Sequence, residues 1–489
     1  MSALNPGHDG PGAPHHWLSH HESFAVWGLG ASGVAAANLL ARHGKRVVIS
    51  DPRQESELGD SLTALHPDVE VVCGQGNQWQ GAEVVVTSPG LRPSLPIFDE
   101  VREAGVPVIS EIELAYDVSV APFLCITGTD GKTTTTSLVG AILAEAGLEH
   151  VVAGNIGTPL CDVVESISEH GYIVAEVSAF QLWTIAHFHP HMAIFTNLAD
   201  DHLDYFDGDY EAYERAKRQL IKHMDPAHDR LWVSGLDPVS SKWHEGFEGR
   251  GGRFALERAA ILPELRDGGG PVACLDSGAL VYLPEGFGNA QEDPIILASD
   301  VTRLGLRGRH NVMNMLAAAA LCFELGVDPE SIEQALCTFE GLPHRFEEVA
   351  RVNGVRFTDD SKATNAHAAL AGLRGADFEH LVVITGGVDK GIELSEFTAF
   401  LRDEAHAVIL IGELTGRLEQ ELLASGMAPE KVRAVEGMEA AVALGFELAK
   451  KEGVLADVVL SPASSSFDMF RSYAHRGEVF QQAVRALCA

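Results

Sequence analysis

One short stretch of the sequence carries the residue types that bind the phosphates of a nucleotide. It follows the apolar run 123–126 and continues as Thr-Gly-Thr-Asp-Gly-Lys-Thr-Thr over 127–134. Backbone N–H groups, the start of a helix and a lysine ammonium attract phosphate oxygens, and a Thr hydroxyl suits Mg²⁺. The spacing is two residues shorter than in the standard phosphate-loop pattern, so the alternative is an ordinary helix start rich in Gly and Thr. We predict that nucleotide phosphates contact Gly128, Thr129, Asp130, Gly131, Lys132, Thr133 and Thr134.

Two later stretches place possible metal ligands at the ends of apolar runs. Glu176 ends the run that starts at Tyr172, where an isolated carboxylate would be costly to bury. His202 lies in an acidic segment after the apolar run 192–196. Parallel sheets bind ligands at the carboxyl ends of their strands. Because Mg²⁺ prefers oxygen ligands, Glu176 is the better candidate, and a purely structural role remains open for His202.

A lysine lies on the apolar face of a predicted helix that starts at Tyr210. Tyr210, Tyr213 and Leu220 form the apolar stripe, and Lys217 follows Tyr213 by four residues on the same stripe. Such a lysine either extends its ammonium to solvent or takes part in chemistry. The spacing alone favours extension to solvent.

A second glycine pattern occurs near the N-terminus. Gly28-Leu-Gly30-Ala-Ser-Gly33 follows the apolar run 24–27, and Asp51 ends the next one. This is the fingerprint of a dinucleotide-binding fold, in which the helix start binds a pyrophosphate. Taken alone it is a common signal that suggests a dehydrogenase.

These residues require strands and helices that alternate along the chain, which predicts an α/β fold with parallel sheets. We expect three domains: a Rossmann-like domain over 22–119, a central phosphate-loop ATPase domain over 120–341 and a Rossmann-like domain over 342–489. Residues 235–300 are rich in Gly and turns and are predicted to form an antiparallel appendage. The predicted strands are 24–27, 46–49, 69–73, 84–86, 106–109, 123–126, 172–177, 192–196, 356–359, 381–385, 407–411 and 458–460.

The N-terminal segment 1–21 is rich in Gly, Pro and His and has no apolar periodicity, so we predict a disordered tail. Its histidines offer metal binding as an alternative; they are His15, His16, His20 and His21.

Composition excludes several classes of function. The formal net charge is −34, from 35 basic and 69 acidic residues, and such a surface repels nucleic acid. The seven cysteines form no CxxC pair, which fits a reducing compartment. No apolar run approaches the roughly 20 residues of a membrane span, and the N-terminus lacks the layout of a signal peptide. We therefore expect a cytoplasmic protein without membrane insertion, and separately we expect a monomer.

Taken together, the chemical motifs resemble those of the Mur ligases and their folylpolyglutamate synthase relatives. The resemblance lies in the short phosphate loop, Gly154-Asn-Ile-Gly157, Glu176 and the segment from Asn197 to Asp204. It covers nearly the whole chain outside the tail. The sequence departs from the family at Asp130, which is usually Asn. Because a carboxylate repels phosphates, we expect Asp130 to cap the following helix.

Motifs in the C-terminal third are similar to those of the branch of this family that adds D-glutamate. They are Leu-Pro-His-Arg at 342–345, Asp-Asp-Ser-Lys-Ala-Thr-Asn at 359–365, Gly-Gly-Val-Asp-Lys-Gly at 386–391 and Leu-Ser-Pro-Ala-Ser-Ser-Ser-Phe-Asp-Met-Phe at 460–470. The resemblance implies that ATP phosphorylates the carboxylate of UDP-N-acetylmuramoyl-L-alanine (UDP-MurNAc-L-Ala). The amine of D-glutamate would then displace phosphate from the acyl phosphate.

The resemblance also implies roles for individual residues. Catalysis would depend on Lys132, His202 and Lys217. Two Mg²⁺ ions would be held by Thr133, Glu176, His202 and Lys217. For Lys217 this requires carbamylation by CO₂, which reverses the preference drawn from spacing.

Further implied contacts come from all three domains. ATP would also contact Asn311, Arg345, Asp359 and Lys390. D-Glutamate would be held by Lys362, Thr364, Ser464 and Phe467. In this family the first domain holds a uridine diphosphate substrate rather than NAD; its contacts would be Gly30, Ser32, Asp51, Arg53, Ser88, Pro89, Gly90, Asn155, Ser178 and His202.

Three rival functions remain open at this point. A folylpolyglutamate synthase would share the phosphate loop, but the C-terminal motifs argue against it. A dinucleotide-dependent oxidoreductase would explain the first glycine pattern, but no proton-relay motif accompanies that pattern. The third is a non-catalytic nucleotide-binding module, in which Lys132→Ala would have no turnover to abolish.

Overall fold

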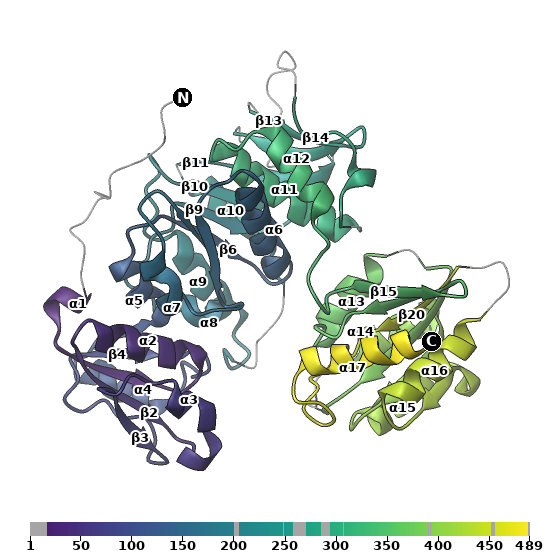
Figure 1. Cartoon of the computed structure of the whole chain (residues 1–489), viewed down its shortest axis with the longest axis horizontal. Coiled ribbons are helices and arrows are strands. Elements are labelled where there is room, and N and C mark those ends of the chain that lie inside the picture. Colours follow the sequence, from purple (N-terminus) through teal and green to yellow (C-terminus); the bar gives the residue numbers. More distant parts are fainter. Residues whose placement is uncertain are drawn as a thin grey trace. The chain divides into compact units, whose positions relative to one another are not determined.

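The computed structural model describes residues 17–199, 205–247, 249–257, 270–284, 294–306, 308–376, 378–389, 391, 393–450 and 455–487. The chain forms three β-sheets with flanking helices (Figure 1). It divides into two compact units, Met1–Gly305 with Asn311–Phe339, and Leu306–His310 with Glu340–Ala489. The first unit contains two of the sheets and the second unit contains the third.

The first sheet has the strand order β3-β2-β1-β4-β5, and every neighbouring pair is parallel. Strand β1 (Ser23–Trp27) is buried along its whole length, as expected for a central strand covered on both faces. The other elements are β2 (Arg46–Asp51), β3 (Glu70–Cys73), β4 (Val84–Thr87), β5 (Val108–Ser110), α2 (Ala31–Arg42), α3 (Gly59–Thr63), α4 (Pro96–Glu103) and α5 (Glu111–Val118).

The prediction of a disordered tail over 1–21 is wrong at its C-terminal end. Trp17–His20 form helix α1, and Leu18 is buried against the core. The backbone N–H of Leu18 donates a hydrogen bond of 2.9 Å to Asp117 at the end of α5. Two apolar residues therefore anchor a segment whose composition predicts disorder. His15 and His16 lie outside the described residues.

The second sheet has nine strands in the order β14-β13-β12-β11-β10-β9-β6-β8-β7. From β7 to β12 all neighbours are parallel, and only β12-β13-β14 pair in antiparallel fashion. The expected antiparallel appendage is thus partly wrong, because β11 and β12 continue the parallel sheet. The elements are β6 (Phe123–Thr127), β7 (His150–Gly154), β8 (Tyr172–Glu176), β9 (Met192–Phe195), β10 (Arg230–Ser234), β11 (Arg250–Glu257), β12 (Val272–Asp276), β13 (Ala279–Leu283), β14 (Ile295–Ala298), α6 (Lys132–Glu145), α7 (Leu160–Val163), α8 (Ala179–Leu182), α9 (Tyr210–Arg218), α10 (Pro238–Glu245), α11 (Arg309–Glu324) and α12 (Pro329–Thr338).

The third sheet has the order β15-β16-β20-β17-β18-β19, and only β15 is antiparallel to its neighbour. Side chains alternate between its faces: Val382 and Ile384 belong to one buried cluster, and Leu381 and Val383 to another. The elements are β15 (Glu347–Val352), β16 (Val355–Asp359), β17 (His380–Gly386), β18 (Ala405–Ile411), β19 (Val432–Ala434), β20 (Ala456–Leu460), α13 (Ala366–Arg374), α14 (Ser395–Glu404), α15 (Thr415–Ala424), α16 (Met438–Ala449) and α17 (Tyr473–Ala486).

The predicted α/β class is confirmed, and each predicted strand overlaps an observed one. Parallel strands bring their carboxyl ends to one edge of a sheet, so the loops after β6, β8 and β9 lie side by side. Among the described residues, no helix is both long and apolar enough to cross a membrane.

Candidate active site

The loop between β6 and α6 adopts a conformation that only glycine permits at two points. Gly128 has φ of 144°, and a Cβ atom there would lie 1.9 Å from the hydroxyl of Thr196. Gly131 has φ of 77°, and a Cβ atom would lie 2.3 Å from the side-chain oxygen of Asn314. Both glycines let neighbouring elements pack directly against the loop backbone. The predicted strand–loop–helix arrangement is confirmed.

The first turn of α6, which follows the loop, is the part suited to bind an anion. The N–H of Thr129 donates to the backbone oxygen of Asn197 (2.9 Å), and the N–H of Asp130 donates to its side chain (3.0 Å). These two groups hold the loop against the segment after β9. The N–H groups of the first turn of α6 have no partner within the helix and carry its positive potential. The N-cap is Gly131, so the expectation that Asp130 caps the helix is wrong.

Two lysine ammonium groups converge on a single carbonyl of this loop. Nζ of Lys132 donates to the backbone oxygens of Gly128 (3.0 Å) and Thr129 (2.7 Å). Nζ of Lys217, which α9 supplies, donates to the same oxygen of Gly128 at 2.6 Å. Lys217 is only 2% exposed, and its ammonium lies 4.9 Å from the ring centroid of Tyr213. The spacing-based preference for extension to solvent is therefore wrong.

The buried carboxylate of Glu176 has one oxygen bonded and one without a partner. Glu176 ends β8 beside β6 and is 1% exposed. Its Oε1 accepts a hydrogen bond of 2.8 Å from the side chain of Asn155, whereas the buried Oε2 has no hydrogen-bond partner. A buried anionic oxygen without a partner is costly unless a ligand completes it. Oxygen ligands of this kind, with the half-buried hydroxyl of Thr133, fit Mg²⁺.

Three residues that contact this loop were not predicted as site residues, namely Tyr213, Asn314 and Asn197. The hydroxyl of Thr129 lies 3.0 Å from that of Tyr213. The side-chain oxygen of Asn314 accepts from Thr135 (3.3 Å), and its nitrogen donates to Asn311 (3.4 Å). Asn314 on α11 and Tyr213 on α9 thus hold the loop in place, and Asn197 holds it from the segment after β9. The recurrence of Asn in Asn311–Asn314, three residues apart on one helix face, is the signal that could have found Asn314.

In the first domain, the carboxylate that ends β2 is hydrogen-bonded to the glycine-rich loop. The carboxylate of Asp51 accepts from the N–H of Leu29 (2.8 Å) and from the guanidinium of Arg53 (2.8 and 2.7 Å). Mainly because of Arg53, the pKa of Asp51 is lowered to about 2. The hydroxyl of Ser88 lies 3.4 Å from the backbone oxygen of Gly28, so two predicted substrate residues border this loop.

The remaining predicted substrate residues of the first unit differ in exposure. Gly30 and Gly90 are exposed, Ser32 and Pro89 are half-buried, and the side chain of Asn155 is held by Glu176. Ser178 is buried, and its hydroxyl bonds to Gln181 in the cap of α8. A substrate would have to compete with that cap to reach the Ser178 hydroxyl.

The third sheet places the predicted acceptor residues in different environments. Nζ of Lys362 lies 3.9 Å from the ring centroid of Tyr473, the first residue of α17. Thr364 is half-buried two residues further on, and the buried hydroxyl of Ser464 donates to the backbone oxygen of Val388. Phe467 is 74% exposed. The aromatic ring against Lys362 is therefore that of Tyr473, which the sequence analysis missed.

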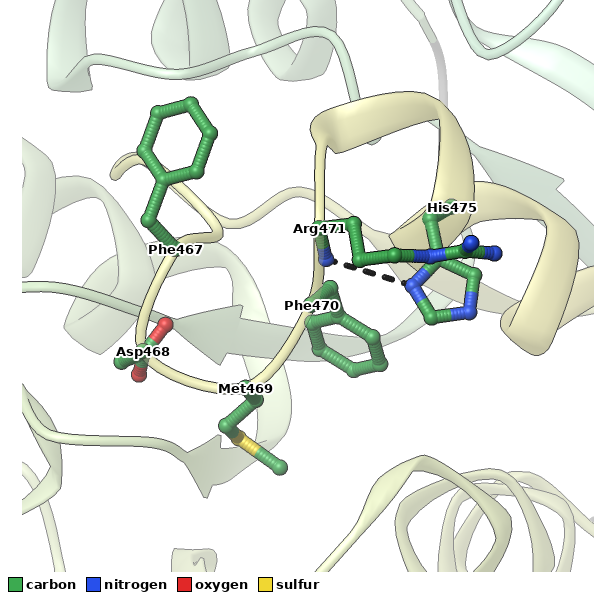
Figure 2. Close-up of a pocket in the computed structure, with 6 residues that line it drawn as sticks. All are labelled: Phe467, Asp468, Met469, Phe470, Arg471 and His475. Carbon is green, nitrogen blue, oxygen red and sulfur yellow. Dashed lines mark hydrogen bonds between the residues drawn. The ribbon is translucent and has the colours of Figure 1, made fainter. Parts of the chain in front are cut away.

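Phe467 instead borders an open pocket of about 570 Å³. Figure 2 shows the loop that carries Phe467, with Phe470 and His475 on the opposite side of the loop from Phe467. Its lining residues are Phe467, Asp468, Met469, Phe470, Arg471 and His475.

Two adjacent aspartates at the end of β16 have different environments: Asp359 is the last residue of the strand and Asp360 follows it. Asp359 is fully buried, and its carboxylate accepts from His344, Gln481 and the N–H of Ser361. Burial raises the pKa of Asp360 to about 8, and Arg345 opposes this shift. Arg345 is half-buried, and the carboxylate of Asp359, which was predicted to contact ATP, is already hydrogen-bonded within the protein. Two other predicted residues, His202 and Lys390, lie outside the described residues.

Three matches with known families fall on the three sheets, one match to each. Residues 22–110 match the Mur ligase MurD-like N-terminal domain, residues 126–256 the Mur ligase middle domain and residues 344–464 the Mur ligase glutamate ligase domain. A protein of Caldanaerobacter subterraneus is 35% identical over 94% of this chain and 98% of its own length. A protein of Salinibacter ruber is 37% identical over 94% of this chain and 97% of its own length. Both are named UDP-N-acetylmuramoylalanine–D-glutamate ligase.

Solved structures agree in fold. The match with UDP-N-acetylmuramate–alanine ligase MurC from Thermotoga maritima spans 95% of this chain and 100% of the MurC chain. Its TM-score is 0.56, and the sequences are 18% identical. A pseudomurein peptide ligase type C from Methanothermus fervidus covers 95% and 100%, with a TM-score of 0.55 and 17% identity. At these identities the likeness concerns the fold alone. From the sequence relatives and the three domain matches together, the chain belongs to the Mur ligase family.

Proposed function

We propose that this protein joins D-glutamate to UDP-MurNAc-L-Ala at the expense of ATP, in the synthesis of peptidoglycan precursors. The observation that carries the proposal is the convergence of Lys132 and Lys217 on Gly128, beside the incomplete carboxylate of Glu176. It occurs in a chain that matches two ligases with this activity in their name over 94% of its length.

The proposed reaction has two steps. A carboxylate oxygen of UDP-MurNAc-L-Ala attacks the γ-phosphorus of ATP, the bond to the β,γ-bridging oxygen breaks, and ADP leaves. The amine of D-glutamate then attacks the carbonyl carbon of the acyl phosphate. Phosphate leaves with the bonding electrons, the amine loses a proton, and an amide remains. Positioning and charge neutralisation supply most of the catalysis in phosphoryl transfer.

The residues of the phosphate loop provide that neutralisation. Lys132 bonds to loop carbonyls without a ligand and can turn its ammonium to the β- and γ-phosphates. The first turn of α6 directs its N–H groups and helix dipole at the same phosphates. Asn314 and Tyr213 keep the loop fixed while Lys132 moves.

We propose that Thr133, Glu176, His202 and Lys217 hold the two Mg²⁺ ions. The chemistry that Mg²⁺ supplies when bound is neutralisation of the charge that develops on the transferring phosphoryl group. Glu176 contributes the oxygen that has no other partner.

Lys217 would be a ligand only in a modified state. Its amine, once neutral, can add CO₂ to give a carbamate and release one proton. The change replaces a positive charge with a negative one. Because Lys132 already donates to the same carbonyl, two ammonium groups repel each other there, and conversion of Lys217 removes that repulsion.

The other proposed contacts follow the fold. Asp51 and Arg53 at the end of β2, with Ser88 after β4, would bind the uridine diphosphate of the substrate. Lys362 and Thr364 would take D-glutamate, with Tyr473 as a neighbour of the lysine. Arg345 would contact ATP. We further propose a cytoplasmic monomer, a compartment that suits the free thiols among the described cysteines.

Release of phosphate tests the proposal. Purified protein is mixed with ATP and Mg²⁺, and phosphate is measured with UDP-MurNAc-L-Ala, with D-glutamate, with both, and with L-glutamate in place of the D-enantiomer. We expect phosphate only with UDP-MurNAc-L-Ala and D-glutamate together. Equal turnover with L-glutamate and a folate substrate would instead support the synthase alternative.

A further inference from the structure

Arg345 lies between two residues with unusual backbone conformations. His344 has φ of 61° and Phe346 has φ of 50°, both in the left-handed region, and neither residue is glycine. Each such residue costs on the order of 1 kcal/mol, so surrounding contacts must hold the turn. The contacts around His344 therefore decide where Arg345 points.

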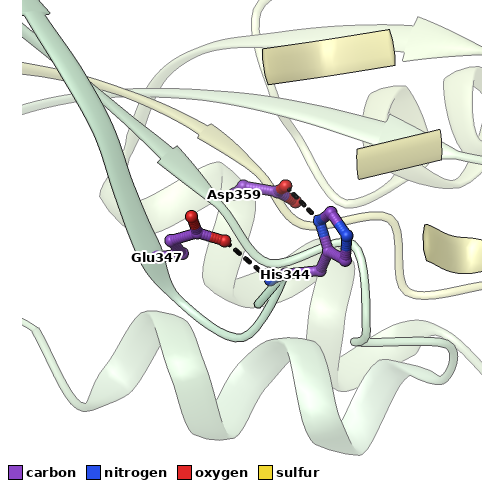
Figure 3. Close-up of side chains that lie close together, drawn as sticks. All are labelled: His344, Glu347 and Asp359. Atoms are coloured by element: carbon purple, nitrogen blue, oxygen red, sulfur yellow. Dashed lines mark hydrogen bonds and ion pairs between the residues drawn. The ribbon is translucent and has the colours of Figure 1, made fainter. Parts of the chain in front are cut away.

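A buried hydrogen-bond network supplies these contacts. Nδ1 of His344 donates to the carboxylate of Asp359 (2.8 Å), because a carboxylate only accepts. The backbone N–H of His344 donates to Glu347 (2.8 Å), and the amide of Gln481 donates to both Glu347 and Asp359 (3.0 Å each). Figure 3 shows His344, Glu347 and Asp359 turned toward one another. The network thus ties the turn to the end of β16 and to α17.

The same turn is linked to the proposed acceptor site. The backbone oxygen of His344 accepts a hydrogen bond of 2.9 Å from the N–H of Lys362. On the other side, the N–H of Phe346 donates to Asp360 at 3.3 Å. His344 is therefore hydrogen-bonded to the residue proposed to bind D-glutamate and covalently joined to the one proposed to contact ATP.

A metal ion is the obvious alternative for this cluster, since ligand atoms of His344, Glu347 and Asp359 lie within 4.8 Å of one another. However, the amide nitrogen of Gln481 already lies 3.0 Å from both carboxylates and 3.5 Å from Nδ1 of His344. That amide nitrogen occupies the place that a cation would take. Gly477 brings α17 this close, because a Cβ atom there would lie 2.1 Å from Nδ1 of His344.

We propose that His344 is a positioning residue that sets Arg345 and Lys362 together, so that ATP and D-glutamate are aligned by one buried network. This inference rests on the proposed function, which assigns ATP to Arg345 and D-glutamate to Lys362. Neither ligand touches His344 itself. Misplacement of reacting groups by about 1 Å costs on the order of 100-fold in rate.

The test compares His344→Leu with His344→Asn and with a matched control. The Asn side chain keeps an N–H that can reach Asp359, and Leu does not. His380→Leu is the control, because His380 is 6% exposed against 8% for His344 and begins β17 at the opposite end of the sheet from Asp359. Steady-state KM values for ATP, D-glutamate and UDP-MurNAc-L-Ala are measured, with thermal unfolding alongside.

We expect His344→Leu to raise the KM for ATP and for D-glutamate by about tenfold or more, while the KM for UDP-MurNAc-L-Ala changes less than twofold. His344→Asn should recover most of the loss, and His380→Leu should lower thermal stability only. If His344→Leu does not fold, Gln481→Met should shift the same two KM values by a smaller factor.

Three results would overturn the inference. The KM values of His344→Leu could change no more than those of His380→Leu, or His344→Asn could show KM values as high as those of His344→Leu. The wild type could also contain one metal ion per chain that is missing from His344→Leu. A wild-type protein that does not use D-glutamate would reject the proposed function instead. In that case the Kd for ATP of His344→Leu against His380→Leu still decides whether His344 positions Arg345.

Discussion

The phosphate-loop region and the region around Lys362 treat their charges in opposite ways. At the loop, Lys132 and Lys217 share one carbonyl, and Glu176 keeps an oxygen without a partner. Around Lys362 the two cations have partners within the protein: the ammonium of Lys362 faces the ring of Tyr473, and the buried Arg476 donates to Ser361, Gly386 and Ser464.

The difference teaches what each region contributes. A buried carboxylate oxygen without a partner, such as that of Glu176, is costly in the free protein, and a metal ion relieves that cost. The contacts of the loop region are therefore complete only when a ligand is bound. In the Lys362 region, contacts already formed in the free protein hold a few groups at fixed positions. Substitutions should then affect activity most at the loop and stability most around Arg476.

Lys132→Ala should give the largest effect. Its ammonium is the charge proposed to follow the γ-phosphate, and loss of such a group lowers kcat by on the order of 10³-fold or more. Phosphate release measures it, with unfolding by urea unchanged. Lys222→Ala is the control, because Lys222 is an exposed lysine that follows α9. Activity retained in Lys132→Ala would contradict the role of the loop.

Lys217→Ala should lower kcat by roughly 10²- to 10³-fold, because it removes a proposed metal ligand. In ¹³C-labelled bicarbonate, the wild type should show a carbamate carbon signal by NMR. The signal should disappear in Lys217→Ala and persist in Lys132→Ala. A wild type without the signal, at full activity, would mean that Lys217 acts as an ammonium.

How far the sequence could predict each region follows from the same comparison. The loop could be predicted because a short run of residues specifies it: Gly128 and Gly131 set the backbone, and Lys132 follows directly. The position of Lys217 also follows from helical spacing, but its direction does not, because only the fold shows that the loop lies within its reach.

The acceptor region could be predicted less well for a physical reason. Its contacts join residues more than a hundred positions apart, such as Lys362 with Tyr473 and Ser361 with Arg476. In the motif around Phe467, several aromatic side chains lie within a few residues. Spacing alone cannot tell which of them faces inward, and the structure turns Tyr473 to Lys362 and leaves Phe467 exposed.

Arg476→Met should mainly lower stability. Arg476 is 1% exposed, and its removal leaves the oxygens of Ser361 and Ser464 without their donors. Loss of a buried hydrogen-bonded charge costs about 3–5 kcal/mol of the free energy of unfolding. Urea unfolding measures it. Arg433→Met is the control, since Arg433 also donates to backbone oxygens but is only half-buried. Equal losses in both variants would show that the frame around Arg476 is not special.

The smallest expected effect concerns the pH dependence of the network around His344. The hydrogen bond to Asp359 raises the pKa of His344 above the ordinary histidine value of 6.5, against the effect of burial. A raised pKa means that the folded protein binds the proton more tightly than the unfolded chain. The stabilisation is therefore complete below pH 6.5 and is lost as the pH rises through the folded pKa. For one hydrogen bond between charged groups we expect a change on the order of 1 kcal/mol. Urea unfolding from pH 6 upward should show this loss in the wild type and not in His344→Asn. Parallel curves for the two proteins would mean that His344 is neutral throughout, so that a neutral ring alone keeps Arg345 and Lys362 in place.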